Sequence, residues 1–252
     1  MSSGSVIPHA SKWILRPAPR PGPAIILYCL PHAGGAASAF RAWHSLLPEW
    51  IEVAAVRLPG RENRVSEPPE FTVAAVARAV AEDSGGRPFA LFGHSMGGRL
   101  AFEVGRALSP TEPLRHLALS GTGHPAAMPD PPNISGLSDP DLVDWLTTRG
   151  GAPAWALADE QYLALLLRTL RSDCAWLERS VHLPAEPLPC ALSVFAGDSD
   201  DAAPPAAMAA WARETAGVFK ARRYVGGHFY LDEQLPALLG DLAADLSVHW
   251  YG

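Results

Sequence analysis

Charge is scarce in this sequence, and positive charge scarcer than negative. Only 18% of the residues are charged and 48% are hydrophobic, which excludes a disordered or highly charged chain. The net charge of −6 lacks the positive surplus that phosphate backbones and anionic membranes attract, so we expect neither nucleic acid nor membrane as a partner. No apolar run approaches the roughly 20 residues that span a bilayer, and the first residues do not resemble an export signal.

Cysteine is scarce as well. The three cysteines, Cys29, Cys174 and Cys190, are an odd number and lack metal-site spacing, so we expect reduced thiols in a cytoplasmic protein. The sequence also has no phosphate-binding loop, no HExxH helix and no CxxC pair, and Gly34-Gly35 lacks the third glycine of a dinucleotide fingerprint. These patterns predict no metal and no organic cofactor.

Short apolar runs alternate with helical patterns along the chain. The runs are continuous rather than alternating, which is typical of strands covered on both faces. They lie at residues 25–30, 51–56, 89–92, 114–119, 191–196 and 218–224. Helices rich in alanine and leucine are predicted at 71–82, 98–108, 206–215 and 235–248. The sequence therefore predicts a single α/β domain over residues 1–252, with a doubly wound, mostly parallel sheet.

Residues 121–187 break this alternation, because no convincing strand run occurs there. We interpret them as an inserted helical lid subdomain. Asp139 is predicted to cap a helix that starts with Pro140 and ends before Gly150. A second helix is predicted from an apolar stripe at helical spacing: Leu163, Leu166, Leu167, Leu170, Cys174 and Leu177. Further apolar residues off the stripe fit either simple core packing or a lid that lines a binding pocket.

The pentapeptide from Gly93 to Gly97 contains the strongest chemical signal. It reads GHSMG and stands between a predicted strand and a predicted helix, which is the context of a nucleophile elbow. Its two glycines remove Cβ atoms that would clash in so sharp a turn. The turn exposes the hydroxyl of Ser95 at a helix amino terminus, where free N–H groups favour negative charge. We predict Ser95 as a nucleophile; the alternative is a glycine-rich structural turn.

A serine nucleophile needs a base and an acid that orients the base. His228 is the predicted base, because it follows the last predicted strand within a Gly-Gly-His-Phe sequence; the alternative is a solvated loop histidine. Three carboxylates, Asp198, Asp200 and Asp201, follow the strand at 191–196. We favour Asp200 as the acid and assign the other two to a solvated turn.

Tetrahedral oxyanions need two N–H donors aimed at one point. One predicted donor is the backbone N–H of Met96, directly after the nucleophile. The other is expected from residues 31–35, Pro-His-Ala-Gly-Gly, where glycines let the backbone approach a ligand. We choose Ala33 for this role; the alternative is a merely flexible turn.

Six motifs cover most of the chain. They are LPHAGG (30–35), RLPGRENR (57–64), FGHSMGG with LAFE (92–103), LRSDCAWLE (170–178), FAGDSD (195–200) and GGHFYL (226–231). Together they resemble the stand-alone type II thioesterases that accompany polyketide and nonribosomal peptide synthetases, which are α/β-hydrolases with the triad order serine, aspartate, histidine. Release thioesterases fused to synthetases often carry their acid after the strand that ends here at Leu119, where this chain reads Ser-Gly-Thr. The chain is thus similar to the discrete editing type.

The resemblance implies hydrolysis of acyl groups from the phosphopantetheine arm of an acyl or peptidyl carrier protein. It implies an acyl-enzyme on Ser95, no cofactor and a monomer. Two other readings stay open at this point. One is a general carboxylesterase or lipase that acts on small oxygen esters with the same residues. The other is an acyl-binding module that has lost hydrolysis, against which the intact Ser95, Asp200 and His228 argue.

Carrier proteins are usually acidic, so a chain of negative net charge is expected to meet them through a local basic patch. The candidate arginines are Arg61, Arg64, Arg168, Arg171 and Arg179. The favoured alternative for these arginines is a solvated helix face.

Overall fold

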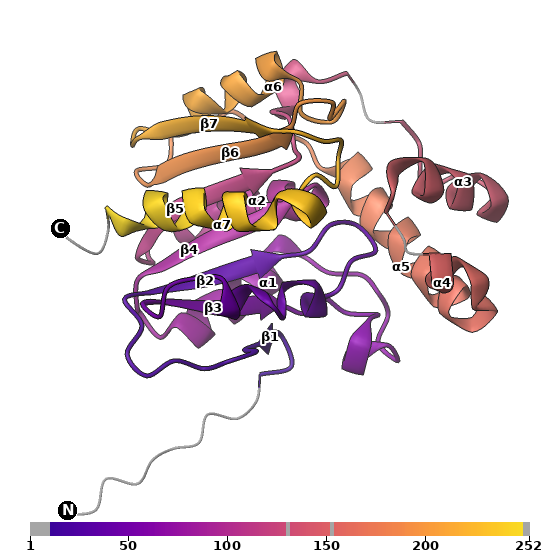
Figure 1. Cartoon of the computed structure of the whole chain (residues 1–252), viewed down its shortest axis with the longest axis horizontal. Helices are drawn as coiled ribbons and strands as arrows, with labels where there is room; N and C mark the ends of the chain where they lie inside the picture. The colour runs from indigo at the N-terminus through magenta and orange to yellow at the C-terminus, as the bar shows by residue number, and fades with distance from the viewer. Residues whose placement is uncertain (1–10, 130–131, 152–153, 249–252) are drawn as a thin grey trace, which may run out of the picture.

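The computed structural model describes residues 11–129, 132–151 and 154–248 of the chain. Its centre is a seven-stranded sheet in the order β1-β3-β2-β4-β5-β6-β7 (Figure 1). The strands are β1 (Ile14–Leu15), β2 (Ile25–Leu30), β3 (Ile51–Val56), β4 (Phe89–His94), β5 (Leu114–Ser120), β6 (Ala191–Gly197) and β7 (Phe219–Tyr224). β1 is antiparallel to β3, and the other neighbouring pairs are parallel. The predicted mostly parallel α/β fold is confirmed.

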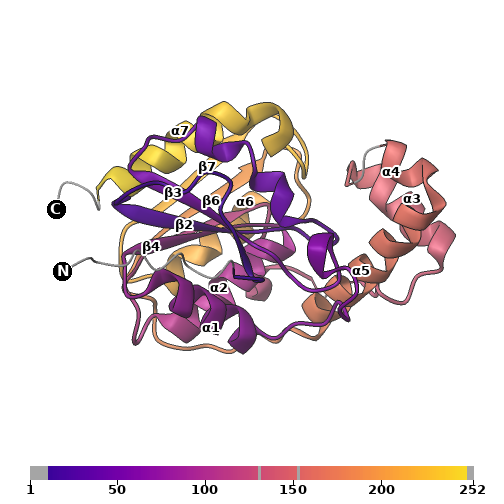
Figure 2. The ribbon, with the colours of Figure 1, turned by 90° about the horizontal axis from the view of Figure 1, so that it is seen from below.

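Helices cover both faces of the sheet (Figure 2). α1 (Val73–Ser84), α2 (Met96–Leu108) and α6 (Pro205–Ala210) share a buried cluster with one face, and α7 (Leu231–Ser247) shares a second cluster with the other. Two short 3-10 helices, Ala37–Phe40 and Trp43–Ser45, join α7 on its side. Every residue of β2, β3 and β4 is buried, which explains why these strands are apolar without alternation.

Several predicted boundaries shift. α1 begins at Val73 because the side chain of Thr72 caps it, accepting the N–H of Ala75. α2 begins two residues earlier than predicted, directly after Ser95. The helix predicted at 206–215 is divided into α6 and a 3-10 helix, Trp211–Glu214, and α7 begins at Leu231 rather than at 235.

In the part of the chain that the structure describes, three α-helices lie between β5 and β6 and project beyond the sheet on one side (Figure 1). They are α3 (Asp139–Arg149), α4 (Ala154–Ala158) and α5 (Glu160–Arg179). The predicted cap of α3 is wrong by one residue: Ser138 accepts the N–H of Asp141, whereas Asp139 is already helical. Gly150 ends α3 as predicted, at φ 72°. The boundaries 121–187 and the role as a lid stay predictions; residues 130–131 and 152–153 lie outside the described residues.

The strand order places a crevice beside Ser95. From β2 the chain moves outward to β3 and then returns to β4 on the other side of β2, so the loops after β2 and β4 diverge. Leu30, the last residue of β2, pairs with Gly93 near the end of β4, so both loops leave the same edge. Ligands of open α/β sheets bind at such a switch point.

Among the described residues, no helix has both the length and the apolarity to cross a membrane.

Candidate active site

Ser95 stands in a strained turn between β4 and α2. Its backbone has φ 57° and ψ −121°, a conformation that costs free energy for any residue with a side chain. A Cβ on Gly93 would overlap the carbonyl of Gly97, and one on Gly97 would overlap the carbonyl of Leu30. The N–H of Ser95 donates to the carbonyl of Ser120 on β5 at 2.8 Å. Neighbouring strands therefore hold the turn that lifts the Ser95 hydroxyl above the sheet edge.

A continuous hydrogen-bond chain links Ser95, His228 and Asp200. Ser95 Oγ lies 2.9 Å from His228 Nε2, and His228 Nδ1 lies 2.9 Å from Asp200 Oδ1. The buried carboxylate of Asp200 also accepts the N–H of Ala202 at 3.0 Å. Because an ionised carboxylate only accepts, Nδ1 carries the imidazole proton. The lone pair on Nε2 therefore faces the hydroxyl of Ser95.

The neighbouring carboxylates point elsewhere. Asp198 accepts the N–H of Gly226, and this hydrogen bond lowers the pKa of Asp198. Asp201 is 77% exposed and pairs with Arg149 of α3 at 3.2 Å. Both residues are exposed and lie in turns, as we expected for the two carboxylates that are not the acid. Of the three candidates, the structure brings Asp200 to His228.

Met96 and Ala33, the two expected N–H donors, flank Ser95. Met96 is the first residue of α2, so its N–H has no intrahelical acceptor. Ala33 follows β2 and lines one small cavity together with Ser95 and His228. His32 Nδ1 donates to the carbonyl of Ala33 at 2.9 Å. Burial lowers the pKa of His32 to about 4, so the ring is neutral and its proton stays on Nδ1.

The cavity at Ser95 is about 20 Å³, close to the space of one water molecule. One end of α3 borders this cavity, because Trp145, Leu146 and Arg149 of α3 and Gly151 after it line the cavity. The loop that carries His228 completes the wall with Phe229.

A buried polar network behind His228 escaped the sequence analysis. His94, 2% exposed, places its ring 5.1 Å from the ring of His228. Its Nδ1 lies 2.9 Å from Ser120 Oγ, which in turn lies 2.8 Å from the hydroxyl of Tyr230. Burial lowers the pKa of His94 well below its ordinary value, so the ring is neutral. In the sequence, Ser120 stood out only because it follows the strand that ends at Leu119, a place where release thioesterases often carry the acid of the triad and this chain has no carboxylate.

Two of the predicted docking arginines are buried, so those predictions are wrong. Arg61 is 6% exposed and makes a bidentate pair with Asp173 of α5. Arg64 is 3% exposed and pairs with Glu67 at 2.7 Å. Their partners satisfy both guanidinium groups inside the molecule, and neither offers a surface to an acidic carrier.

One cluster within the described residues has the composition of a metal site. Ligand atoms of His124, His182 and Glu214 lie within 4.8 Å of one another. However, the N–H of Ala126 donates to His124 Nδ1, so a neutral His124 carries its proton on Nε2 and donates it to Glu214 Oε1 at 2.9 Å. A protonated Nε2 cannot ligate a metal, so we read the cluster as a hydrogen-bonded network.

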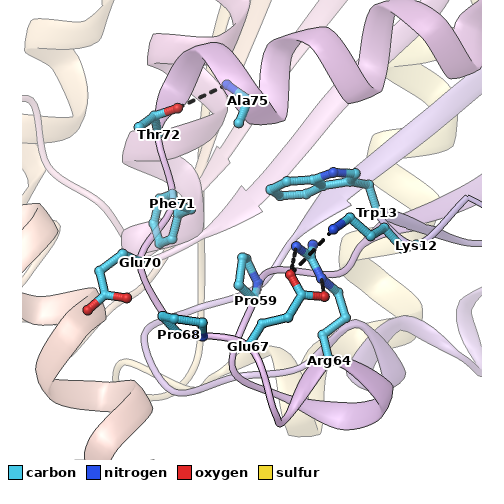
Figure 3. A pocket seen from close by; sticks show the side chains of 10 residues that line it. All are labelled: Lys12, Trp13, Pro59, Arg64, Glu67, Pro68, Glu70, Phe71, Thr72 and Ala75. Carbon is cyan, nitrogen blue, oxygen red and sulfur yellow. Dashed lines mark hydrogen bonds and ion pairs between the residues drawn. The ribbon is translucent and has the colours of Figure 1, made fainter.

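A larger cavity, about 450 Å³, lies away from Ser95 (Figure 3). Three of its charged groups pair with one another: the carboxylate of Glu67 lies between the guanidinium of Arg64 and the ammonium of Lys12. The hydrogen bond from Arg64 lowers the pKa of Glu67 to about 2. Arg64 also stacks 4.0 Å from the ring centre of Trp13. This cavity contains no part of the Ser95 chain of hydrogen bonds.

The sequence and the structure resemble known proteins. The family described as Thioesterase domain matches residues 25–246. Thioesterase PikA5 of Streptomyces venezuelae is 37% identical over 243 residues, 94% of this chain and 86% of its own. Gramicidin S biosynthesis protein GrsT of Aneurinibacillus migulanus is 33% identical, over 90% of this chain and 91% of its own. The solved type II thioesterase BorB from the borrelidin biosynthetic cluster superposes with a TM-score of 0.85 at 34% identity, covering 94% of this chain and 99% of its own.

Proposed function

The chain belongs to the thioesterase family, and from this premise we propose that it removes acyl groups from carrier proteins by way of an acyl-enzyme on Ser95. It is a hydrolase of thioesters, of the type II kind found with polyketide and nonribosomal peptide synthetases. The observation that carries the proposal is the hydrogen-bond chain from Ser95 through His228 to Asp200, with both links at 2.9 Å.

In the first step Ser95 Oγ attacks the thioester carbonyl while His228 Nε2 takes the hydroxyl proton. Asp200 holds the proton-bearing Nδ1 of His228 and stabilises the imidazolium that forms. The N–H groups of Met96 and Ala33 receive the oxyanion of the tetrahedral intermediate. When the intermediate collapses, the C–S bond breaks and the protonated His228 gives its proton to the departing sulfur, so the thiol leaves, Ser95 is acylated and His228 is neutral again.

In the second step a water molecule takes the place of the thiol. His228 removes a proton from this water, and the same two N–H groups receive the second oxyanion. As the ester bond to Ser95 breaks, His228 returns that proton to Ser95 Oγ. The products are a free carboxylic acid and the regenerated serine. The cavity of about 20 Å³ accommodates such a water but not an acyl chain.

Substrate entry therefore requires α3 to move away from Ser95. Trp145 and Leu146 of α3 cover the cavity, and Arg149 ties α3 to Asp201 in the loop that carries Asp200. An exposed ion pair of this kind contributes only about 0.2 to 1 kcal/mol. This weak tie is compatible with a lid that opens for each substrate.

The phosphopantetheine thioester of a carrier protein is the proposed substrate. A thiol ionises near pH ~8.5, far below an alcohol, so its departure needs little help from an acid. The triad would cleave oxygen esters by the same steps, so preference for thioesters rests on the pocket and on the partner. The names of the matched relatives, which include thioesterases of antibiotic biosynthesis, support a carrier-bound substrate.

Two measurements test the proposal. A fluorophosphonate is expected to label Ser95 in the native protein and not in Ser95→Ala, and the absence of labelling would indicate a binding module without catalysis. The kcat/KM for an acyl-carrier thioester is expected to exceed that for a p-nitrophenyl ester of the same acyl chain. The reverse order would favour a general carboxylesterase.

A further inference from the structure

We propose that Asp173, on α5 of the insertion, is a positioning residue that fixes the oxyanion-binding loop next to Ser95. This inference rests on the proposed function, because it takes the N–H of Ala33 as an oxyanion donor. Asp173 does not touch the substrate in this account. It acts through the backbone of residues 32–35.

The carboxylate of Asp173 is fully buried and has three donors. Its Oδ2 accepts the backbone N–H of Gly34 at 2.8 Å and Arg61 Nη1 at 2.9 Å, and its Oδ1 accepts Arg61 Nη2 at 2.8 Å. A carboxylate is acceptor-only, so all three bonds are charge-assisted. A helix of the insertion is thereby bonded directly to the loop after β2.

Both ends of one peptide group are held. The carbonyl of Ala33 accepts the Nδ1 proton of His32, and the N–H of the same peptide group, which belongs to Gly34, donates to Asp173. These two bonds point in opposite directions from one planar unit. They fix the orientation of this peptide group, which directly follows the N–H of Ala33 in the chain.

Arg61 extends this restraint by one residue. Besides binding Asp173, its Nη1 donates to the carbonyl of Gly35 at 2.8 Å, and its Nε donates to the carbonyl of Pro59 at 3.1 Å. The guanidinium therefore joins the Asp173 carboxylate, the loop after β2 and the loop after β3. Because the fork geometry is rigid, lysine cannot replace these contacts.

Packing presses the loop against the same helix. Gly34 has φ 74°, and a Cβ there would lie 3.2 Å from Leu166 Cδ1 and 3.6 Å from Leu170 Cβ, both on α5. Ala33 packs against the cluster that joins α3 to α5. The loop is thus held by hydrogen bonds and by contact with α5, so this helix is a fixed support rather than the moving part of the lid.

Such a restraint matters for rate because an oxyanion donor works only when it is placed in advance. Losing one donor costs about 10² to 10³ in rate, and a displacement of about 1 Å can cost about 10². Ground-state binding of the acyl chain does not use this donor. Disturbing Asp173 is therefore expected to lower kcat and to leave KM nearly unchanged.

The test compares Asp173→Asn with Asp245→Asn. Asp245 is a matched control on α7: its side chain is also fully buried and pairs with Lys220 at 2.7 Å and Arg222 at 2.6 Å, but it does not contact the loop after β2. For hydrolysis of a p-nitrophenyl ester, Asp173→Asn is expected to lower kcat about 10- to 100-fold with KM within about 2-fold. Asp245→Asn is expected to keep kcat within about 2-fold at a temperature where the protein is folded.

A second readout separates placement of the donor from loss of structure. An acyl trifluoromethyl ketone forms a hemiketal anion on a reactive serine, so its affinity is expected to fall with kcat in Asp173→Asn. If Asp173→Asn does not fold, Arg61→Lys provides the same readouts. Wild-type kcat in the folded variant, or equal losses in Asp173→Asn and Asp245→Asn, would overturn the proposal. Failure of the proposed function would appear in the wild-type protein, as ester hydrolysis without hydrolysis of acyl-carrier thioesters.

Discussion

Gly97 lies so close to Leu30 that any side chain on it would overlap the carbonyl of Leu30. Leu30 is the last residue of β2, and Gly97 is the second residue of α2. This contact therefore sets the separation between the turn of Ser95 and the loop of Ala33. The two halves of the proposed site meet at a point where only glycine fits.

Replacing Gly97 by alanine is expected to displace Ser95 from His228. The added Cβ collides with backbone atoms, which cannot rotate away as a side chain does, so kcat is expected to fall at least about 10²-fold or the protein to unfold. The measurements are kcat and the melting temperature. Gly240→Ala on α7 is the matched control: a Cβ there meets no atom within 4 Å, and the helix is expected to gain about 0.5 to 1 kcal/mol. A fully active Gly97→Ala would contradict the packing argument.

The three carboxylates after β6 are expected to differ sharply when changed to asparagine. Asp200→Asn favours the wrong imidazole tautomer of His228 and is expected to lower kcat about 10⁴-fold. Asp201→Asn removes only an exposed ion pair with Arg149. Because such a pair contributes at most about 1 kcal/mol, kcat is expected to change by about 5-fold or less. Asp198→Asn is expected to behave like Asp201→Asn, because Asp198 does not contact His228. Equal losses at all three positions would remove Asp200 from its proposed role.

Stability is expected to fall on acidification through the buried His94. Its folded-state pKa is lowered by burial, whereas the unfolded chain binds a proton near the ordinary value of 6.5. Below that pH the unfolded state holds the extra proton, so stability is present above about pH 6.5 and is lost as the pH falls.

The change in unfolding free energy attributable to His94 approaches about 1.4 kcal/mol per pH unit below its unfolded pKa. Urea unfolding of the wild type and of His94→Asn, compared between about pH 7 and pH 5, measures this slope. The variant is expected to lose less stability over the interval. If the unfolding free energy depended on pH equally in the two proteins, His94 would take up its proton as readily in the folded state as in the unfolded state, which would contradict a lowered pKa.

The exposed arginines of α5 are expected to speed the encounter with an acidic carrier. Arg168 and Arg179 are exposed and have no carboxylate partner among the described residues, although Arg168 Nη2 also donates to the carbonyls of Val65 and Glu67. Arg171, in contrast, is paired with Asp139 at 2.5 Å. Changing Arg168 and Arg179 together to glutamate is expected to lower kcat/KM for an acyl-carrier substrate at low salt and to spare a small acyl thioester. Arg115→Glu, an exposed change at the start of β5, is the charge control. Equal losses of kcat/KM on both substrates would contradict a role of these arginines in binding the carrier protein.

The sequence predicts most where one local pattern is sufficient. The unbroken apolar residues of β2 and β4 correspond to strands buried on both faces, and the pentapeptide around Ser95 stands between a strand and a helix as predicted. Asp200 and His228 could be predicted to lie close together because residues after parallel strands meet at one edge of a sheet, and the two side chains are 2.9 Å apart. The two-residue strand β1 is too short to leave a pattern.

Contacts between distant residues lie outside what such patterns can predict. Arg61 and Asp173 are 112 residues apart, and each alone looks like a solvated charge. Their pairing buries both, which is why Arg61 was wrongly assigned to a docking surface. The hydrogen bonds of His94 and Tyr230 to Ser120 likewise span 26 and 110 residues. The support of the proposed site therefore appears only in three dimensions.

Intact-protein mass spectrometry of an acyl-loaded carrier protein, incubated with the wild type or with Ser95→Ala, tests the central claim most directly. The wild type is expected to return the carrier to its free-thiol mass, and Ser95→Ala is expected to leave the acyl group in place over the same period. Brief incubation is also expected to show wild-type enzyme heavier by one acyl group. Deacylation of the carrier by Ser95→Ala at the wild-type rate would contradict the account.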